Sequence, residues 1–120
     1  MQNRVELLST GIIYVEKIGD QTEQSMFEML GKINQFIAQL RAAKKPVLIL
    51  SNAKAEGKMD MSAIALATKI GTDMDYDKSA TYGSSAFLHA LREHLISEAQ
   101  LNQKVANFKT KKEALAWLTK

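Results

Sequence analysis

Cysteine is absent from this sequence of 120 residues, and proline occurs once, at Pro46. The absence of cysteine excludes disulfide bonds, thiolate catalysis and cysteine-based zinc sites, and it is typical of a cytoplasmic protein. Long apolar runs are also missing, since no segment approaches the roughly 18 apolar residues of a membrane span. No apolar stretch follows Arg4, so we expect no signal peptide and a cytoplasmic location.

The sequence also lacks a strong excess of charge of either sign. The 16 basic and 13 acidic residues leave a net charge of +3, which is spread along the chain. Domains that bind nucleic acids concentrate basic residues on one face, and arginine suits the reading of phosphates and bases better than lysine. Lysines outnumber arginines here, so we expect no nucleic-acid partner. With 46% hydrophobic residues, the composition indicates one globular domain over residues 1–120.

The motifs that mark common catalytic and cofactor sites are missing. Neither glycine-rich phosphate-binding pattern, G-x-G-x-x-G or G-x-x-x-x-G-K, occurs. His89 and His94 lie about 140° apart around a helix, so they cannot share a metal ion. We expect His89 to point outward and His94 to border the apolar stripe of its helix. The sequence therefore predicts neither enzymatic activity nor a bound metal or cofactor.

Three alternating carboxylates resemble half of a calcium-binding loop. Asp73, Asp75 and Asp77 have the spacing of its first ligands. Lys78 and Ser84, however, stand where that loop requires glycine and glutamate. We therefore predict a solvated turn here and no metal site.

Short apolar segments alternate with amphipathic helical patterns along the chain. The predicted strands span residues 5–8, 12–18, 46–50, 79–82 and 105–108, and the predicted helices run to about Ala43, from about 61 to 70 or 74, to about Ala99 and from 111 to 119. The tripeptide Ser-Thr-Gly between the first two strands favours a hairpin, which makes the first strand an antiparallel edge. The order ββαβαβαβα predicts an α/β fold with a mixed, mostly parallel sheet of about five strands and with about four helices.

The segment from 46 to 70 is the centre of this scheme. Its opening run, Pro-Val-Leu-Ile-Leu, is short and apolar, as expected for a strand buried on both faces, with Leu48 and Leu50 inaccessible. A polar loop is predicted at 51–58, and Asp60 is the expected cap of the following helix. Ligands and chemistry collect beyond the carboxyl ends of parallel strands, so this loop and helix start are the first candidate site.

Caps and apolar stripes orient the other helices. Asp20 or Thr22 is expected to cap the first helix, and Gly31 within it is expected to mark close packing on the sheet. The stripe of that helix consists of Met26, Leu30, Ile33, Ile37 and Leu40. The expected stripe of the helix that ends near Ala99 consists of Phe87, Leu88, Leu91 and Leu95.

The order of elements resembles the SpoIIAA-like fold of the small bacterial STAS and SEC14-like domain family. The ending Asn-Phe-Lys-Thr-Lys-Lys-Glu-Ala-Leu-Ala-Trp-Leu, residues 107–118, is similar as well. In anti-sigma-factor antagonists of this family, a serine in the pattern Asp-Ser-Ser-Gly-Leu is phosphorylated by a partner kinase. Asp60 and Ser62 match that pattern here, whereas Met61, Ala63 and Ile64 do not. The resemblance implies a small regulatory protein-interaction module; the alternative is a binder of a lipid or another apolar small molecule, as in SEC14-like domains.

Ser62 has two interpretations. As a phosphorylation site, it would place a phosphate on the free N–H groups of a helix N-terminus, with Lys58 and Lys69 able to assist and Asp60 opposing. As a structural residue, it would satisfy a backbone donor in the first turn, which is a common role of serine.

The helix face opposite the predicted core stripe is unusually apolar for a face in water. Such a patch commonly marks an interface, and a second copy of the chain is the most available partner, so we expect a homodimer. The expected interaction surface consists of Lys58, Met59, Asp60, Met61, Ile64, Ala65 and Thr68.

Overall fold

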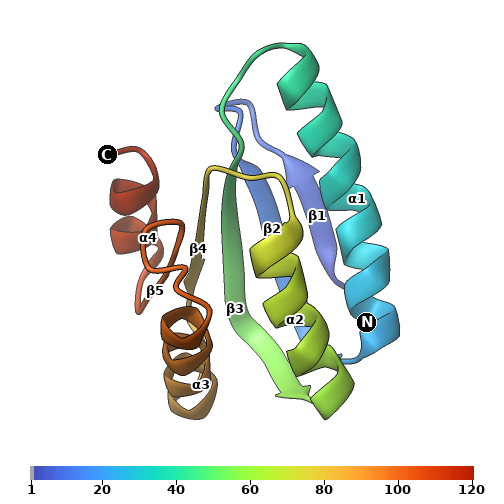
Figure 1. The fold of residues 1–120 in the computed structure, drawn as a ribbon, viewed down its shortest axis with the longest axis vertical. Coiled ribbons are helices and arrows are strands. Elements are labelled where there is room, and N and C mark those ends of the chain that lie inside the picture. The colour runs from blue at the N-terminus through green and yellow to red at the C-terminus, as the bar shows by residue number, and fades with distance from the viewer. Residues whose placement is uncertain (1) are drawn as a thin grey trace.

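The computed structural model describes residues 2–120 and confirms the order ββαβαβαβα (Figure 1). The elements are β1 (Arg4–Leu7), β2 (Ile13–Gln21), α1 (Glu23–Ala42), β3 (Leu48–Met59), α2 (Met61–Asp73), β4 (Lys78–Tyr82), α3 (Ala86–Glu98), β5 (Val105–Phe108) and α4 (Lys111–Leu118). Asp60 caps α2 as expected, because its side chain accepts a hydrogen bond from the backbone N–H of Ala63.

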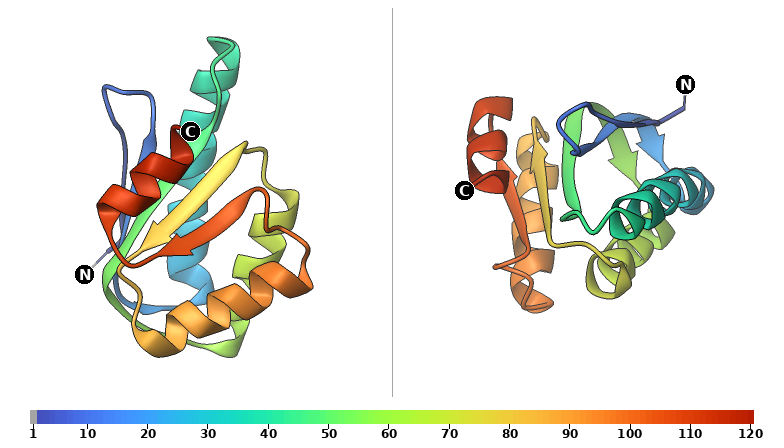
Figure 2. Two further views of the ribbon diagram at one scale, coloured as in Figure 1. Left: turned by 90° about the vertical axis from the view of Figure 1, so that its left-hand side faces the viewer. Right: turned by 90° about the horizontal axis from the view of Figure 1, so that it is seen from above.

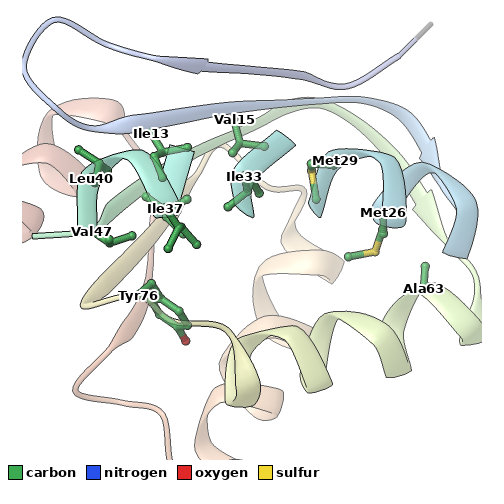
Figure 3. Packing of buried hydrophobic residues seen from close by; sticks show 11 residues of the cluster. Ile13, Val15, Met26, Met29, Ile33, Ile37, Leu40, Val47, Ala63 and Tyr76 are labelled. Atoms are coloured by element: carbon green, nitrogen blue, oxygen red, sulfur yellow. The ribbon is translucent and has the colours of Figure 1, made fainter. Parts of the chain in front are cut away.

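The five strands form one sheet in the order β1-β2-β3-β4-β5. β1 pairs antiparallel with β2, and the other pairs are parallel, which confirms the mixed sheet with an antiparallel edge. Helices α1, α2 and α3 cover one face of the sheet, and α4 covers the other (Figure 2). Figure 3 shows the core between the sheet, α1 and α2, where Ile33 and Ile37 of α1 face Ile13 and Val15 of β2.

The central strand is buried as expected at Leu50 and Ile49, whereas Leu48 keeps partial exposure. The expectation that Leu48 is inaccessible was therefore wrong. Leu48 lies on the sheet face covered by the short helix α4, where it packs at the margin of the smaller core cluster. A helix of eight residues leaves part of that face open.

The polar loop expected at 51–58 is not a loop, because β3 continues to Met59. β2 is also longer than expected, and the two strands stay paired as far as Gln21 and Met59, with two register irregularities. β4 pairs with β3 only up to Asn52. The last seven residues of β3 therefore pair with β2 alone, and their other edge is open to side chains from α3.

Asp20, one of the two candidate caps of α1, has a different role. Thr22 caps this helix in a capping box with Ser25, while the Asp20 carboxylate accepts a hydrogen bond of 2.8 Å from the backbone N–H of Lys58. Gly57 allows the strands to approach here, since a Cβ atom at this position would collide with the Asp20 side chain. The carboxylate thus secures the far end of the β2–β3 ladder.

Helix α3 is rotated relative to the expected stripe. Phe87 is 75% exposed, and the buried residues are Leu88 and Ile96, with Arg92 between them at the same i, i+4 spacing. The expectations for the histidines were also reversed, because His94 is exposed and His89 is half-buried beside Glu93. A charged residue in the inward row hid the true phase of the helix from a hydrophobicity pattern.

The change in pairing along β3 generates the first prediction. Amides at 49–52 lie between two paired strands, whereas those at 53–59 have a strand on one side only. Hydrogen exchange measured by NMR should therefore be slowest at Ile49 and Leu50 and clearly faster beyond Ala53. Uniform protection over the whole strand would contradict this assignment.

Two glycines form a matched pair for the second prediction. Gly83 has a φ of +81°, and a Cβ atom there would lie 2.5 Å from Cγ of Lys54. Gly83→Ala should lower the free energy of unfolding by about 1–3 kcal/mol. Gly31 is exposed with nothing near its Cβ position, contrary to the expected close packing, so Gly31→Ala should raise stability by up to about 1 kcal/mol. Urea denaturation measures both, and equal effects would refute the argument.

Candidate functional site

Four helices begin at one edge of the molecule, because strands β2 to β5 run parallel and each leads directly into a helix (Figure 1). The three large hydrophobic side chains that are exposed within residues 2–120 all lie near this carboxyl edge. Phe27, Met61 and Phe87 are 53%, 81% and 75% exposed, and each occurs within the first five residues of its helix. Burying such side chains against a partner lowers the free energy of the system.

The start of α2 presents both polar and apolar groups to solvent. Lys58, Asp60, Met61 and Ser62 are exposed, whereas Met59 is partly buried. The Asp60 carboxylate accepts the capping hydrogen bond from the N–H of Ala63 at 2.8 Å. Asp60 therefore caps the helix. The backbone N–H of Ala63 already has Asp60 as its acceptor, so Ser62 is not needed to satisfy it.

The structure divides the rest of the expected interaction surface. Ala65 is exposed next to Met61, whereas Ile64 and Thr68 are partly buried. The Thr68 hydroxyl donates to the carbonyl oxygen of Ile64 at 3.1 Å, and Thr68 lines a cavity between the helices and the sheet. Thr68 therefore belongs to the interior side of α2, and the solvent-facing part of the set lies at the helix start.

A cavity of about 150 Å³ lies between the sheet and helices α1, α2 and α3. Figure 3 shows Met26 and Met29 of α1, two of its apolar walls. Its remaining apolar lining comes mainly from Val15, Ile33, Ile49, Ala67, Ile70, Met74, Leu95 and Ile96. Its polar lining includes Lys17, Ser51, Thr81, Arg92 and Asn107. Polar groups that converge on an apolar cavity are the usual composition of a small-molecule site.

A buried ion pair closes the cavity on the side of α3. Nη2 of Arg92 lies 2.7 Å from both carboxylate oxygens of Glu56, and Nη1 donates to the Ser84 hydroxyl at 2.7 Å. The Glu56 side chain is fully buried and that of Arg92 is nearly so. Because breaking such a pair leaves a charge buried without a partner, the pair fixes α3 against the extended part of β3.

Lys17 brings a second positive charge into the same region. The pKa of Lys17 is lowered to about 8, mainly by burial of its ammonium group and also by the charge of Arg92, while Glu56 acts in the opposite direction. The residue as a whole keeps some exposure, so it is the ammonium end that is withdrawn from water. Within residues 2–120, Lys17 forms no ion pair.

Asn107 on β5 contributes an unused acceptor. Its Nδ2 donates to Glu93 at 3.2 Å, whereas its Oδ1 is buried and has no hydrogen-bond partner among the described residues. A buried carbonyl oxygen without a donor is costly in free energy.

Two of the three aspartates that resemble half of a calcium loop serve another purpose. Arg41 binds Asp75 at 2.9 Å and Asp77 at 3.1 Å, and Asp77 also accepts a 2.7 Å hydrogen bond from the N–H of Val47. The hydrogen bond from Arg41 lowers the pKa of Asp75, and that from Val47 is the main cause of the lowered pKa of Asp77. No cluster of potential metal ligands occurs in residues 2–120.

The ion pair at the cavity's charged end was missed in the sequence. Glu56 falls in the segment predicted as a polar loop, and Arg92 was not among the residues of the predicted apolar stripe. Lys17 offered a usable signal. It follows Ile13 and Val15 at two-residue spacing, so it lies on the same buried face of the strand. A lysine in that register is unusual and indicates a buried cation.

The lowered pKa of Lys17 generates a prediction on pH. Between pH 8 and 10.5 the unfolded chain keeps a proton that the folded chain releases, so the free energy of unfolding should rise with pH in this window. Below pH 8 both states are protonated, and the full cost of burying the charge remains. Lys17→Met should therefore be more stable than wild type at neutral pH, and the difference should shrink as the pH approaches 10.5.

Urea denaturation across this pH range checks the prediction, with Lys112→Met on the exposed side of α4 as the matched control. The control should follow wild type at every pH. A stability difference for Lys17→Met that does not change with pH would show that Lys17 titrates normally.

No helix within residues 2–120 is long and apolar enough to cross a membrane. A search of curated proteins finds no match. Two solved structures share the fold. One is an uncharacterized protein with a SpoIIAA-like fold from Shewanella loihica PV-4, with 14% identity, a TM-score of 0.69, and coverage of 97% of this chain and 91% of that one. The other is the anti-sigma factor antagonist SpoIIAA in its unphosphorylated form, with 15% identity, a TM-score of 0.63, and coverage of 95% and 94%.

Identities this low show a common fold and nothing finer, and they give no support to the lipid-binding alternative. The family model described as SpoIIAA-like matches residues 12–119, which is nearly the whole chain and every element from β2 to α4. The chain therefore belongs to the SpoIIAA-like family.

Proposed function

We propose that this chain is a regulatory protein-interaction module without catalytic activity, and that it contacts its partner through the start of α2. The observation that carries the proposal is the exposure of Met61, which leaves 81% of an apolar residue in water at a helix start. Lys58, Asp60 and Ser62 surround it in sequence and are also exposed. An apolar centre with a polar rim is the usual composition of a protein interface.

Likeness in fold to SpoIIAA supports a regulatory role, since that protein is an anti-sigma factor antagonist with an unphosphorylated form. Ser62 is the candidate for a corresponding modification here. Its side chain is exposed on the first turn of α2. A phosphate there gains from the helix N-terminus, loses from the nearby Asp60 carboxylate, and adds charge and bulk beside Met61.

A second copy of the chain is the partner we propose to test first. Two-fold pairing would place Met61 of one copy against Met61 of the other, and it would bury the exposed start of α2 in both copies. The proposal also includes Ala65, which is exposed one turn later on the same helix. Ile64 is partly buried, so Ile64→Asp would mix a change in association with a change in stability.

Met61→Asp is the sharper variant. It should shift wild-type dimers to monomers at micromolar concentration without changing the thermal midpoint, because the side chain has few contacts to lose within its own chain. Sedimentation velocity measures the association. Ala116→Asp, on the exposed side of α4, is the control and should leave association unchanged. A wild-type monomer would contradict the proposed self-association.

Ser62→Asp tests the regulatory part separately. The added charge should weaken the same association while circular dichroism and the thermal midpoint stay constant. Ser97→Asp, at an exposed position near the end of α3, is the control. Association that is equal in Ser62→Asp and wild type, together with intact masses free of phosphate in every growth phase, would argue against a switch at Ser62.

A further inference from the structure

The cavity under α1, α2 and α3 differs from a simple packing defect in its charge. Lys17 and Arg92 both line it, and the carboxylate of Glu56 is the partner of Arg92. The two positive groups therefore face one buried carboxylate, which leaves one cation uncompensated. A buried charge without a counterion is costly, so this region favours an anion.

The size of the cavity limits what can enter. Its volume is about 150 Å³, and an engineered protein cavity of about that volume holds a benzene molecule. A long acyl chain does not fit within this volume. The apolar walls from Met26, Met29 and Ile70 suit a compact hydrocarbon group.

We propose that this cavity binds a small carboxylate whose apolar body is about the size of a benzene ring. The carboxylate pairs with the ammonium of Lys17, and the apolar body contacts the methionines of α1. The site uses the interior of the fold, so it goes beyond the contact surface proposed at the start of α2.

The ionisation of Lys17 agrees with this site. Its pKa is lowered to about 8 by burial and by Arg92, against the opposing effect of Glu56. A bound anion would favour the charged lysine, so binding should draw a proton into the protein above pH 8. Glu93 faces Asn107, and Glu56 is already occupied by Arg92, so neither neutralises Lys17 directly.

Binding of three small probes tests the proposal. Isothermal titration of wild type with para-hydroxybenzoate, benzoate and phenol should give higher affinities for the two carboxylates than for phenol. Lys17→Met should lower the affinity for both carboxylates by about tenfold or more and leave phenol unchanged. Lys112→Met, an exposed lysine on the opposite side of the sheet, should bind all three as wild type does.

The location of binding is tested by a second variant. Ala67→Leu places a larger side chain in the cavity wall and should weaken all three probes, while NMR of the methionine methyl groups should report the probes at Met26 and Met29 in wild type. Binding that survives Ala67→Leu, or carboxylate affinity that survives Lys17→Met, would overturn the proposal. The absence of any methionine shift at saturating probe would do the same.

Discussion

The length of β3 is the constraint on which the rest of this structure depends. The strand runs for 12 residues, whereas its neighbour β4 runs for five and stops pairing at Asn52. The final part of β3 is held by β2 alone, with Asp20 securing its far end. Its open edge places Glu56 beneath α3. A carboxylate buried there needs a cation beside it to offset the cost of desolvation.

The position of α3 follows from that pairing. Arg92 is drawn inward between Leu88 and Ile96, and this leaves Phe87 in solvent at the carboxyl edge. Arg92 also lines the cavity, with Lys17 at its border. The exposure of Phe87 and the charge at the cavity thus both follow from one buried ion pair.

The regular parts of this fold follow local rules, and the sequence therefore predicted them well. The order of elements, the antiparallel edge, the cap at Asp60 and the limits of β5 depend on nearby residues. The polar extension of β3 does not, because its backbone pairs with a strand 36 or more residues earlier, as the pairing of Ser51 with Val15 shows. The burial of Glu56 and Arg92, which are 36 residues apart, could not be predicted for the same reason. Each charged side chain is stable in the interior only because it pairs with the other.

A double-mutant cycle on Glu56 and Arg92 tests this account most directly. Urea unfolding of wild type, Glu56→Gln, Arg92→Met and the double variant gives the coupling energy between the two side chains. If the pair fixes α3 on β3, the single changes are each strongly destabilising, and their effects fall short of additivity by about 1–3 kcal/mol. Effects that add to within about 0.5 kcal/mol would contradict the account, because they would show that α3 keeps its place without the pair.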